Sequence, residues 1–367
     1  MSLHLEAIGT AVPRHFIEQT DAVEVARDFC ASSCVQPRVL ARLYARSGVR
    51  TRHSVVLRES TNGAPANQSF YLPASGVDDL GPTTAERMRV YEEAASQLGV
   101  RAGADALAIA ETAPREVTHL ITVSCTGFHS PGVDVALVRE LGLDAGVART
   151  HVGFMGCHAA LNALRVAKAF TDSRPEACVL VCAVELCSLH YQYGWDPDRL
   201  VSNALFADGA AAVVARSSLG SKGGQPGGWQ LISSASAIVP ETEDAMRWHI
   251  RDHGFEMGLS ARVPDLIRER LRPWLASWLA DADLSIEEVG SWAIHPGGPR
   301  ILTACGLACD LSEPELRASA DVLAEYGNMS SPTILFILER LRRQSAAGPC
   351  VALAFGPGLT IEAALFH

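Results

Sequence analysis

The chain has 367 residues, 48% of them hydrophobic, and a formal net charge of −10. This length and hydrophobic content predict a large buried core and exclude extensive disorder. The negative charge argues against binding to nucleic acid or to an anionic membrane surface, so an anionic ligand would need a local basic patch.

The first residues and the cysteines are typical of a protein of the cell interior. No basic segment precedes a long apolar run at the start, and no stretch has the 18 or more apolar residues of a membrane span. The ten cysteines are diluted over a long chain, which favours free thiols. The pairs Cys30/Cys34 and Cys305/Cys309 lack the companion ligands of a zinc site. We therefore expect a cytoplasmic protein without a bound metal.

A basic stripe is the first predicted element with a functional interpretation. Arg38, Arg42 and Arg46 recur every four residues, so they would share one face of a helix. Such a stripe is either a phosphate-binding surface or a solvated helix face, and the sequence leaves both interpretations open.

A loop rich in Gly, Pro, Ser and Asn is predicted for 58–82, and Thr83 with Glu86 then forms a capping-box pattern at the start of a helix over 83–99. Ser312 and Glu315 repeat that pattern before a second helix.

Between and beyond these helices, short apolar runs alternate with longer amphipathic stretches. The runs are 119–125, 177–185, 209–215, 291–296 and 350–355. This alternation predicts an α/β protein whose sheets are covered on both faces.

A tight turn separates a predicted strand from an apolar helix at Gly153–Gly156, and it places Cys157 at the helix N-terminus. Free backbone N–H groups and the helix dipole at such a position favour a thiolate, which predicts a lowered pKa for this cysteine. The same turn can donate an N–H to an oxyanion. The segment alone is also compatible with a structural cysteine, because cysteines are often buried.

The sequence nearly repeats itself. The segment 153–168 aligns with 327–342 through Gly-x-Met, a small residue and leucines at matching helical positions, and a cysteine-containing strand follows each. Chance similarity between two turn-helix-strand units is the alternative to an internal duplication. The Gly-rich segment 217–228 would connect the halves, which we place at 1–220 and 228–367.

Two residues of the second half are candidate partners of Cys157. His295 follows a predicted strand and precedes two glycines, and Asn328 lies in the turn equivalent to the one that carries Cys157. In a duplicated fold these turns would meet at one cavity. A hydrogen-bonded core histidine and a helix N-cap are the structural alternatives for His295 and Asn328.

Over nearly its whole length the chain resembles the type III polyketide synthases, the chalcone and stilbene synthase family of the thiolase superfamily. HPGGP, GNMSSPT and FGPG separate this family from the related ketoacyl-ACP synthases III. The matching segments are SCTGFHSPGVD (124–134), GFMGCHAALNALR (153–165), ALFADGAAAVV (204–214), AIHPGGPRIL (293–302), EYGNMSSPTILFIL (325–338) and AFGPGLTIE (354–362).

The resemblance implies a thiolase-like α/β fold with two duplicated halves in five layers, α-β-α-β-α. It also implies that Cys157 is the acyl-accepting nucleophile and that His295 and Asn328 complete a triad. The implied activity is loading of a starter from an acyl-CoA and extension with malonyl-CoA, with coenzyme A thioesters as substrates and no cofactor. The product would be a pyrone, a resorcinol or a related aromatic.

Further positions follow from the resemblance. Phe206 matches an aromatic gatekeeper, Met257 stands where plant members carry phenylalanine, and bulky Trp248 stands where they often have glycine. Ser130 replaces a larger residue and would open another route for an acyl tail. The remaining implied pocket positions are Cys125, Thr126, Cys187, His190, Ser330, Gly356 and Pro357.

For the coenzyme A phosphates the resemblance implies contacts with Arg42 and Arg46, and Arg300 is a further candidate. A homodimer is implied as well. Two alternatives stay open: a ketoacyl-ACP synthase III-like enzyme that stops after one condensation, and an inactive partner subunit. The presence of Cys157, His295 and Asn328 argues against the inactive subunit.

Overall fold

The computed structural model describes residues 2–31, 35–58, 67–218 and 228–367. Cys34, most of the predicted linker 217–228 and part of the predicted loop 58–82 lie outside the described residues. The helices of the described parts are α1 (Gln19–Arg27), α2 (Pro37–Ala45), α3 (Thr84–Ile109), α4 (Val133–Leu141), α5 (Ala159–Ser173), α6 (Pro197–Leu205), α7 (Val263–Ala280), α8 (Pro299–Cys309), α9 (Glu313–Tyr326) and α10 (Pro332–Arg343). None of them is both long and apolar enough to cross a bilayer.

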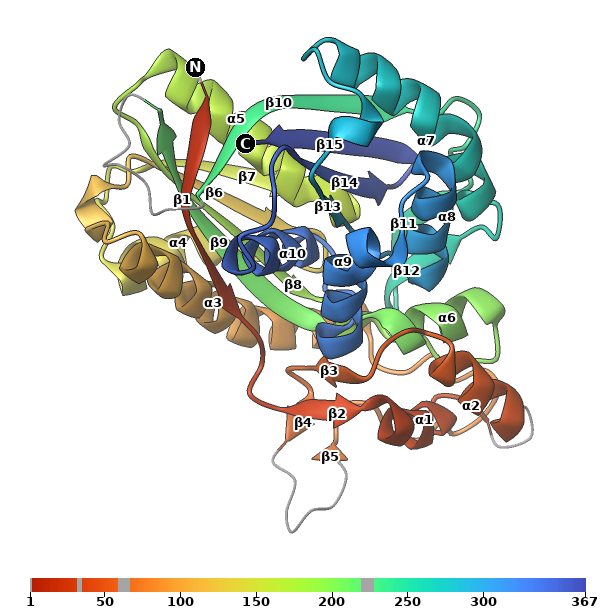
Figure 1. The fold of residues 1–367 in the computed structure, drawn as a ribbon. Coiled ribbons are helices and arrows are strands. Elements are labelled where there is room, and N and C mark those ends of the chain that lie inside the picture. Colours follow the sequence, from red (N-terminus) through yellow and green to blue (C-terminus); the bar gives the residue numbers. More distant parts are fainter. Residues whose placement is uncertain (1, 32–34, 59–66, 219–227) are drawn as a thin grey trace.

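Most of the described strands belong to one mixed sheet (Figure 1). Its members are β1 (Leu3–Ala11), β6 (His119–Ser124), β7 (Ala148–Gly153), β8 (Cys178–Leu186), β9 (Asp208–Ser217), β10 (Trp229–Ile238), β13 (Ser291–Ile294), β14 (Cys350–Gly356) and β15 (Thr360–Phe366). Their order is β13-β14-β15-β10-β1-β9-β8-β6-β7. Three two-stranded sheets accompany it: β2 (Phe16–Glu18) with β3 (Thr51–His53), β4 (Leu57–Arg58) with β5 (Asn67–Gln68), and β11 (Met246–Arg251) with β12 (Gly254–Leu259).

Both predicted capping boxes are present. Thr83 accepts a hydrogen bond from the N–H of Glu86 at the start of α3, and at the start of α9 the Ser312 N–H donates to the Glu315 carboxylate at 2.7 Å. The first of these helices is longer than the predicted 83–99, since α3 continues to Ile109. Its small residues there, among them Ala102 and Ala106, are fully buried against the sheet, so tertiary packing extends the helix.

The two halves repeat one strand topology. In the first half β6 runs parallel to β8, which is antiparallel to β9, which is antiparallel to β1. In the second half β13, β14, β15 and β10 have the same order and directions. β1 also pairs with β10 through Leu3–Leu5, so the strands of the two halves form one continuous sheet. This repetition agrees with the duplication that the sequence predicts.

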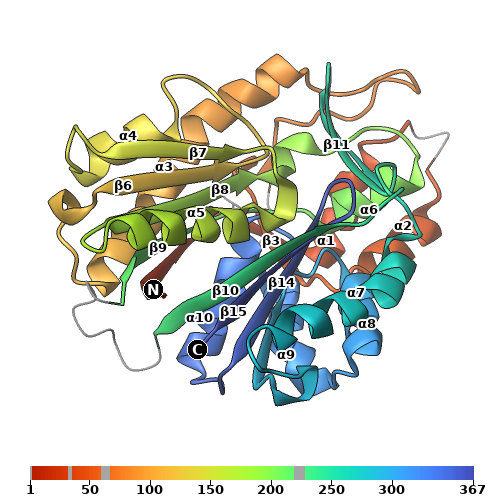
Figure 2. The ribbon, with the colours of Figure 1, turned by 90° about the horizontal axis from the view of Figure 1, so that it is seen from above.

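The elements stack in five layers (Figure 2). Helices α3 and α4 cover one outer face, α7 and α8 cover the other, and α5 with α10 lies between the two sheet halves. Consecutive strand residues point alternately to an outer and to the central helix layer. Leu120 packs with the outer layer of α3 and α4, and Ile121 packs with the central layer of α5 and α10. Each sheet half is therefore buried on both faces, as the continuous apolar runs predict.

The two turns that precede the central helices have matching backbones. Gly156 has φ +78°, and Ser330, its counterpart in the sequence alignment of the halves, has φ +56°. A left-handed conformation is favourable for glycine and costs a serine free energy. The Asn328 side chain offsets that cost, because its Oδ1 accepts a hydrogen bond from the Ser330 N–H at 2.8 Å.

Candidate active site

Cys157 lies in a 3-10 turn, Gly156–His158, between β7 and α5. Close packing dictates this turn: a Cβ on Gly156 would come within 2.7 Å of the Pro357 ring in the β14–β15 loop. The Cys157 side chain is buried, and the Ser330 Oγ lies 3.5 Å from its sulfur. The turn that carries Cys157 in the first half therefore packs against loops of the second half.

His295 and Asn328 reach the same place from the second half. His295 follows β13, is fully buried, and donates its backbone N–H to the Leu353 carbonyl at 2.8 Å. Cys157, His295 and Asn328 all line one cavity of about 30 Å³. Among the described residues nothing hydrogen-bonds either ring nitrogen of His295, so both remain able to bind a substrate group. The juxtaposition predicted for these residues is present in the structure.

The pKa of Cys157 differs from the prediction. Burial raises the pKa of Cys157 to about 11, and the Ser330 hydroxyl and a backbone N–H offset only part of that effect. Burial, with a smaller contribution from His158, lowers the pKa of His295 to about 3. The expectation of a lowered cysteine pKa is therefore wrong, because desolvation outweighs the helix N-terminus. The site therefore holds a protonated thiol near a neutral imidazole.

These pKa values predict a steep pH dependence for alkylation of Cys157. Only the thiolate reacts with iodoacetamide, so the rate constant should rise about tenfold per pH unit between pH 7 and pH 9. Mass spectrometry of the peptide that carries Cys157 would measure this rate constant at each pH. Cys187 in the same protein is an internal comparison. A rate constant that stays level over this range would instead indicate a thiolate–imidazolium pair.

The cavity beside Cys157 is walled by large side chains. Phe206, Met246 and Met257 line it, and Met257 is paired with Trp248 across the β11–β12 hairpin. Trp248 is held in place because its indole N–H donates to the Cys125 carbonyl at 2.7 Å. Trp248 lines a second cavity at Cys157, which measures only about 20 Å³. Both spaces are close to the size of one water molecule, so side chains nearly fill the chamber around Cys157.

Most of the other implied pocket positions line this inner cavity. They are Cys125, Thr126, Cys187, Ser330 and Pro357. Ser330 Oγ lies 3.4 Å from the Cys125 sulfur, so one hydroxyl contacts two thiols. Three implied positions are placed otherwise: Gly356, Ser130 and His190. Gly356 packs against the His158 ring, and Ser130 is exposed in the loop before α4. Neither belongs to the residues that line the two inner cavities.

His190 faces the protein backbone rather than the cavity. Its Nε2 lies 2.6 Å from the Thr126 carbonyl, and its Nδ1 accepts a hydrogen bond from the Phe255 N–H at 3.0 Å. Burial lowers its pKa to about 3, which keeps the ring neutral. His190 therefore supports the wall behind Trp248, onto whose ring its own packs edge-on.

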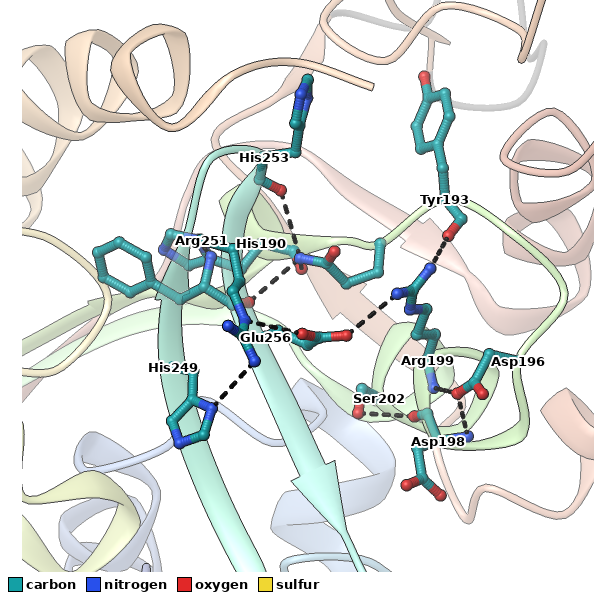
Figure 3. Close-up of polar contacts among 12 residues, drawn as sticks. His190, Tyr193, Asp196, Asp198, Arg199, Ser202, His249, Arg251, His253 and Glu256 are labelled. Carbon is teal, nitrogen blue, oxygen red and sulfur yellow. Dashed lines mark hydrogen bonds and ion pairs between the residues drawn. The ribbon is translucent and has the colours of Figure 1, made fainter. Parts of the chain in front are cut away.

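The β11–β12 hairpin is attached to α6 on its outer side (Figure 3). Arg199 of α6 forms an ion pair with Glu256 at 3.1 Å, and Arg251 contacts the same carboxylate at 3.2 Å. Asp196 caps the first turn of α6 through two backbone N–H groups. These contacts fix the hairpin that carries Trp248 relative to the helix that ends at Phe206.

Glu185 is a site residue that the sequence analysis missed. It is fully buried in β8, and its carboxylate accepts hydrogen bonds from the Cys125 N–H, the Thr126 hydroxyl and the Ser331 hydroxyl. Burial raises its pKa. A lone carboxylate within an apolar strand was the available signal, because a buried charge requires such partners.

An outer cavity of about 400 Å³ leads toward the inner ones. Arg46 and Arg300 line it, whereas Arg42 lies on the exposed face of α2 and outside the lining. The outer cavity shares four wall residues with the cavity at Cys157: Leu205, Leu259, Gly297 and Ile301. The cavity at Cys157 thus adjoins an outer cavity with a basic rim.

Family comparisons agree with this architecture. Two family models match the chain: chalcone and stilbene synthases, N-terminal domain, over residues 2–218, and chalcone and stilbene synthases, C-terminal domain, over residues 230–367. The crystal structure of PKS-I from the brown alga Ectocarpus siliculosus superposes with a TM-score of 0.90 at 28% identity, covering 100% of this chain and 98% of that one. The fold is thiolase-like, as the resemblance implies.

Two bacterial relatives are similar over nearly the whole chain. The alpha-pyrone synthesis polyketide synthase-like Pks18 of Mycobacterium tuberculosis is 34% identical over 99% of this chain and 90% of its own length. The 1,3,6,8-tetrahydroxynaphthalene synthase of Streptomyces peucetius is 33% identical over 98% of this chain and 92% of its own length. The chain therefore belongs to the chalcone and stilbene synthase family, the type III polyketide synthases, which are acyltransferases that condense malonyl-CoA with loss of CO2.

Proposed function

We propose that the protein loads an acyl group from a coenzyme A thioester onto Cys157 and extends it with malonyl-CoA. In the loading step His295 takes the thiol proton, the sulfur attacks the thioester carbonyl, and coenzyme A leaves with that proton. Malonyl-CoA then loses CO2, and the electron pair of the broken bond becomes an enolate. The enolate carbon attacks the Cys157 thioester, which releases the sulfur as a thiolate, and a proton from water then restores the thiol.

The observation that carries this proposal is the meeting of Cys157, His295 and Asn328 at one cavity. Oδ1 of Asn328 already holds the Ser330 N–H, which leaves the amide NH2 group to donate to the enolate oxygen. Because the pKa of His295 is lowered to about 3, this imidazole is a second donor without a net charge. Two fixed neutral donors in a buried site stabilise a developing oxyanion.

Coenzyme A would enter through the outer cavity. Arg46 and Arg300 form its basic rim, and the apolar wall between them and the inner cavity suits a pantetheine arm. Arg42 would contact the nucleotide phosphates from outside the cavity. A local basic rim offsets the net charge of −10, which would otherwise repel a polyanionic ligand.

The product that we propose is a pyrone, a resorcinol or a related aromatic ring. The relatives named for alpha-pyrone synthesis and for tetrahydroxynaphthalene synthesis support this class. Trp248 and Met257 leave little space near the sulfur, which argues against a product as large as a chalcone. Growth of the chain would require these two side chains to move.

The protein would act as a homodimer. The strand β7 is an edge of the sheet, and the neighbouring Phe128, Phe154 and Met155 expose 55%, 38% and 41% of their surface. An unpaired edge beside exposed apolar side chains is a typical association surface. A second copy on this surface would cover the turn that leads to Cys157.

Incubation with labelled malonyl-CoA and a panel of acyl-CoA starters tests the proposal. We expect products that contain two or more malonyl-derived units, identified by mass spectrometry. A single extension that requires an acyl-carrier protein would favour a ketoacyl-ACP synthase III-like activity. Absence of turnover by folded protein with every starter, together with absence of malonyl-CoA decarboxylation, would indicate an inactive partner subunit.

A further inference from the structure

Arg52 is a buried cation without a carboxylate partner among the described residues. It lies on β3 and is 3% exposed. Its Nη1 donates to the carbonyls of Asn203 and Phe206 and to the Tyr191 hydroxyl, the last two at 3.1 Å and 3.0 Å. The rings of Tyr44 and Tyr191 lie within 6 Å of the guanidinium. An unpaired buried charge is costly, so this arrangement requires a reason.

The carbonyls that Arg52 binds are those at the end of α6. The last carbonyls of a helix lack partners within the helix and carry the negative end of its dipole, so a cation there is stabilising. Here every one of them has a donor: the Gln19 side chain binds the Ala204 carbonyl, and the Asn328 N–H binds that of Leu205. Arg52 therefore completes the C-terminal cap of the helix that ends at Phe206.

The capped end of α6 is joined directly to the Asn328 turn. The Asn328 N–H donates to the Leu205 carbonyl at 2.8 Å, and the Asn328 carbonyl accepts from the Ala207 N–H at 2.9 Å. These two bonds flank Phe206 and bridge the two halves of the chain. Gly327, with φ +72°, lies against the Arg52 side chain, and a Cβ there would be 3.0 Å from Arg52 Cγ.

We infer that Arg52 is a positioning residue that sets the place of Asn328 relative to Phe206 from the side remote from the cavity. Without its guanidinium, the Asn203 carbonyl loses its donor and the Phe206 carbonyl keeps only the Tyr191 hydroxyl, so we expect the backbone around Phe206 to shift. The two hydrogen bonds between Asn328 and the residues that flank Phe206 transmit that shift to Asn328. This inference rests on the proposed function, in which Asn328 binds the enolate oxygen.

The two half-reactions separate this role from a general loss of stability. Loading of Cys157 is followed by intact mass, and malonyl-CoA decarboxylation by release of labelled CO2. Because a displacement of about 1 Å can cost about a hundredfold in rate, Arg52→Gln should lower decarboxylation by about ten- to a hundredfold while loading stays within about threefold. Arg52→Lys, which keeps a cation near the carbonyls, should recover part of the decarboxylation.

A matched control is Arg216→Gln. Arg216 is also buried, but it pairs with Glu6 and Glu116 on β1 and before β6, away from the cavity. Its loss should change both half-reactions by the same factor. Equal losses in Arg52→Gln would overturn the inference, and so would unchanged decarboxylation. If wild-type protein performs neither half-reaction, the proposed function fails instead.

Tyr191→Phe provides a second variant if Arg52→Gln does not fold. It removes the hydroxyl that donates to the Phe206 carbonyl at 2.9 Å and accepts from Arg52, and it keeps the ring. We expect a smaller loss of decarboxylation than in Arg52→Gln, again with loading nearly unchanged. A loss of loading that matches the loss of decarboxylation would contradict the role of this network.

Discussion

Cys157→Ala should abolish acyl loading, with a loss of at least about a thousandfold in the rate of adduct formation, because no other group can replace the attacking sulfur. Intact-mass measurement after incubation with an acyl-CoA would show the missing adduct. Decarboxylation of malonyl-CoA should persist in the same variant, because that step needs the donors from His295 and Asn328 and no thiol.

Cys187→Ala is the matched control for this experiment. Its thiol lines the same inner cavity, and burial raises its pKa well above the usual value. A loading rate within about threefold of wild type is expected, since Cys187 does not line the cavity that Cys157 shares with His295 and Asn328. If the Cys157→Ala protein still forms an acyl adduct, and the adduct is lost when Cys187 is also replaced by alanine, then Cys187 is the nucleophile instead.

Asn328→Ala should slow malonyl-CoA decarboxylation by about a hundredfold or more and leave acyl loading within a few-fold. The reason is that one preorganised oxyanion donor is typically worth this much, and the amide has no role in thiol attack. Release of labelled CO2 measures the first reaction and intact mass the second. The Ser330 N–H also loses its acceptor in this variant.

Asn328→Asp controls for that lost acceptor. A carboxylate can still accept from the Ser330 N–H, but it places a negative charge where the enolate forms. Decarboxylation should therefore fall at least as far as in Asn328→Ala. A variant that decarboxylates as well as wild type, or an equal loss of loading and decarboxylation in Asn328→Ala, would show that this residue does not stabilise the enolate.

Features that depend on local sequence were predictable. The capping boxes at Thr83 and Ser312, the apolar strands and the glycine turn before Cys157 all appear where the sequence places them. Short-range patterns determine these elements, because a cap or a tight turn needs only neighbouring residues. The meeting of His295 and Asn328 with Cys157 followed from the repeat and from the family resemblance.

Features that depend on burial were not predictable from local patterns. The dipole argument for Cys157 is correct in sign, yet desolvation is larger and reverses the outcome. His190 faces the backbone although its position suggested the cavity. Arg52 and Glu185 acquire their roles from partners distant in the sequence, and no spacing within one segment reveals such contacts.

The position of β1 has a consequence for biosynthesis. This strand holds the first described residues, yet it lies in the middle of the sheet and pairs with both β9 and β10. A nascent chain leaving the ribosome must therefore keep an unpaired apolar strand until Asp208–Ser217 has been translated. Such long-range pairing slows folding and exposes the emerging polypeptide to aggregation, so chaperone supply should govern the soluble yield in a heterologous host.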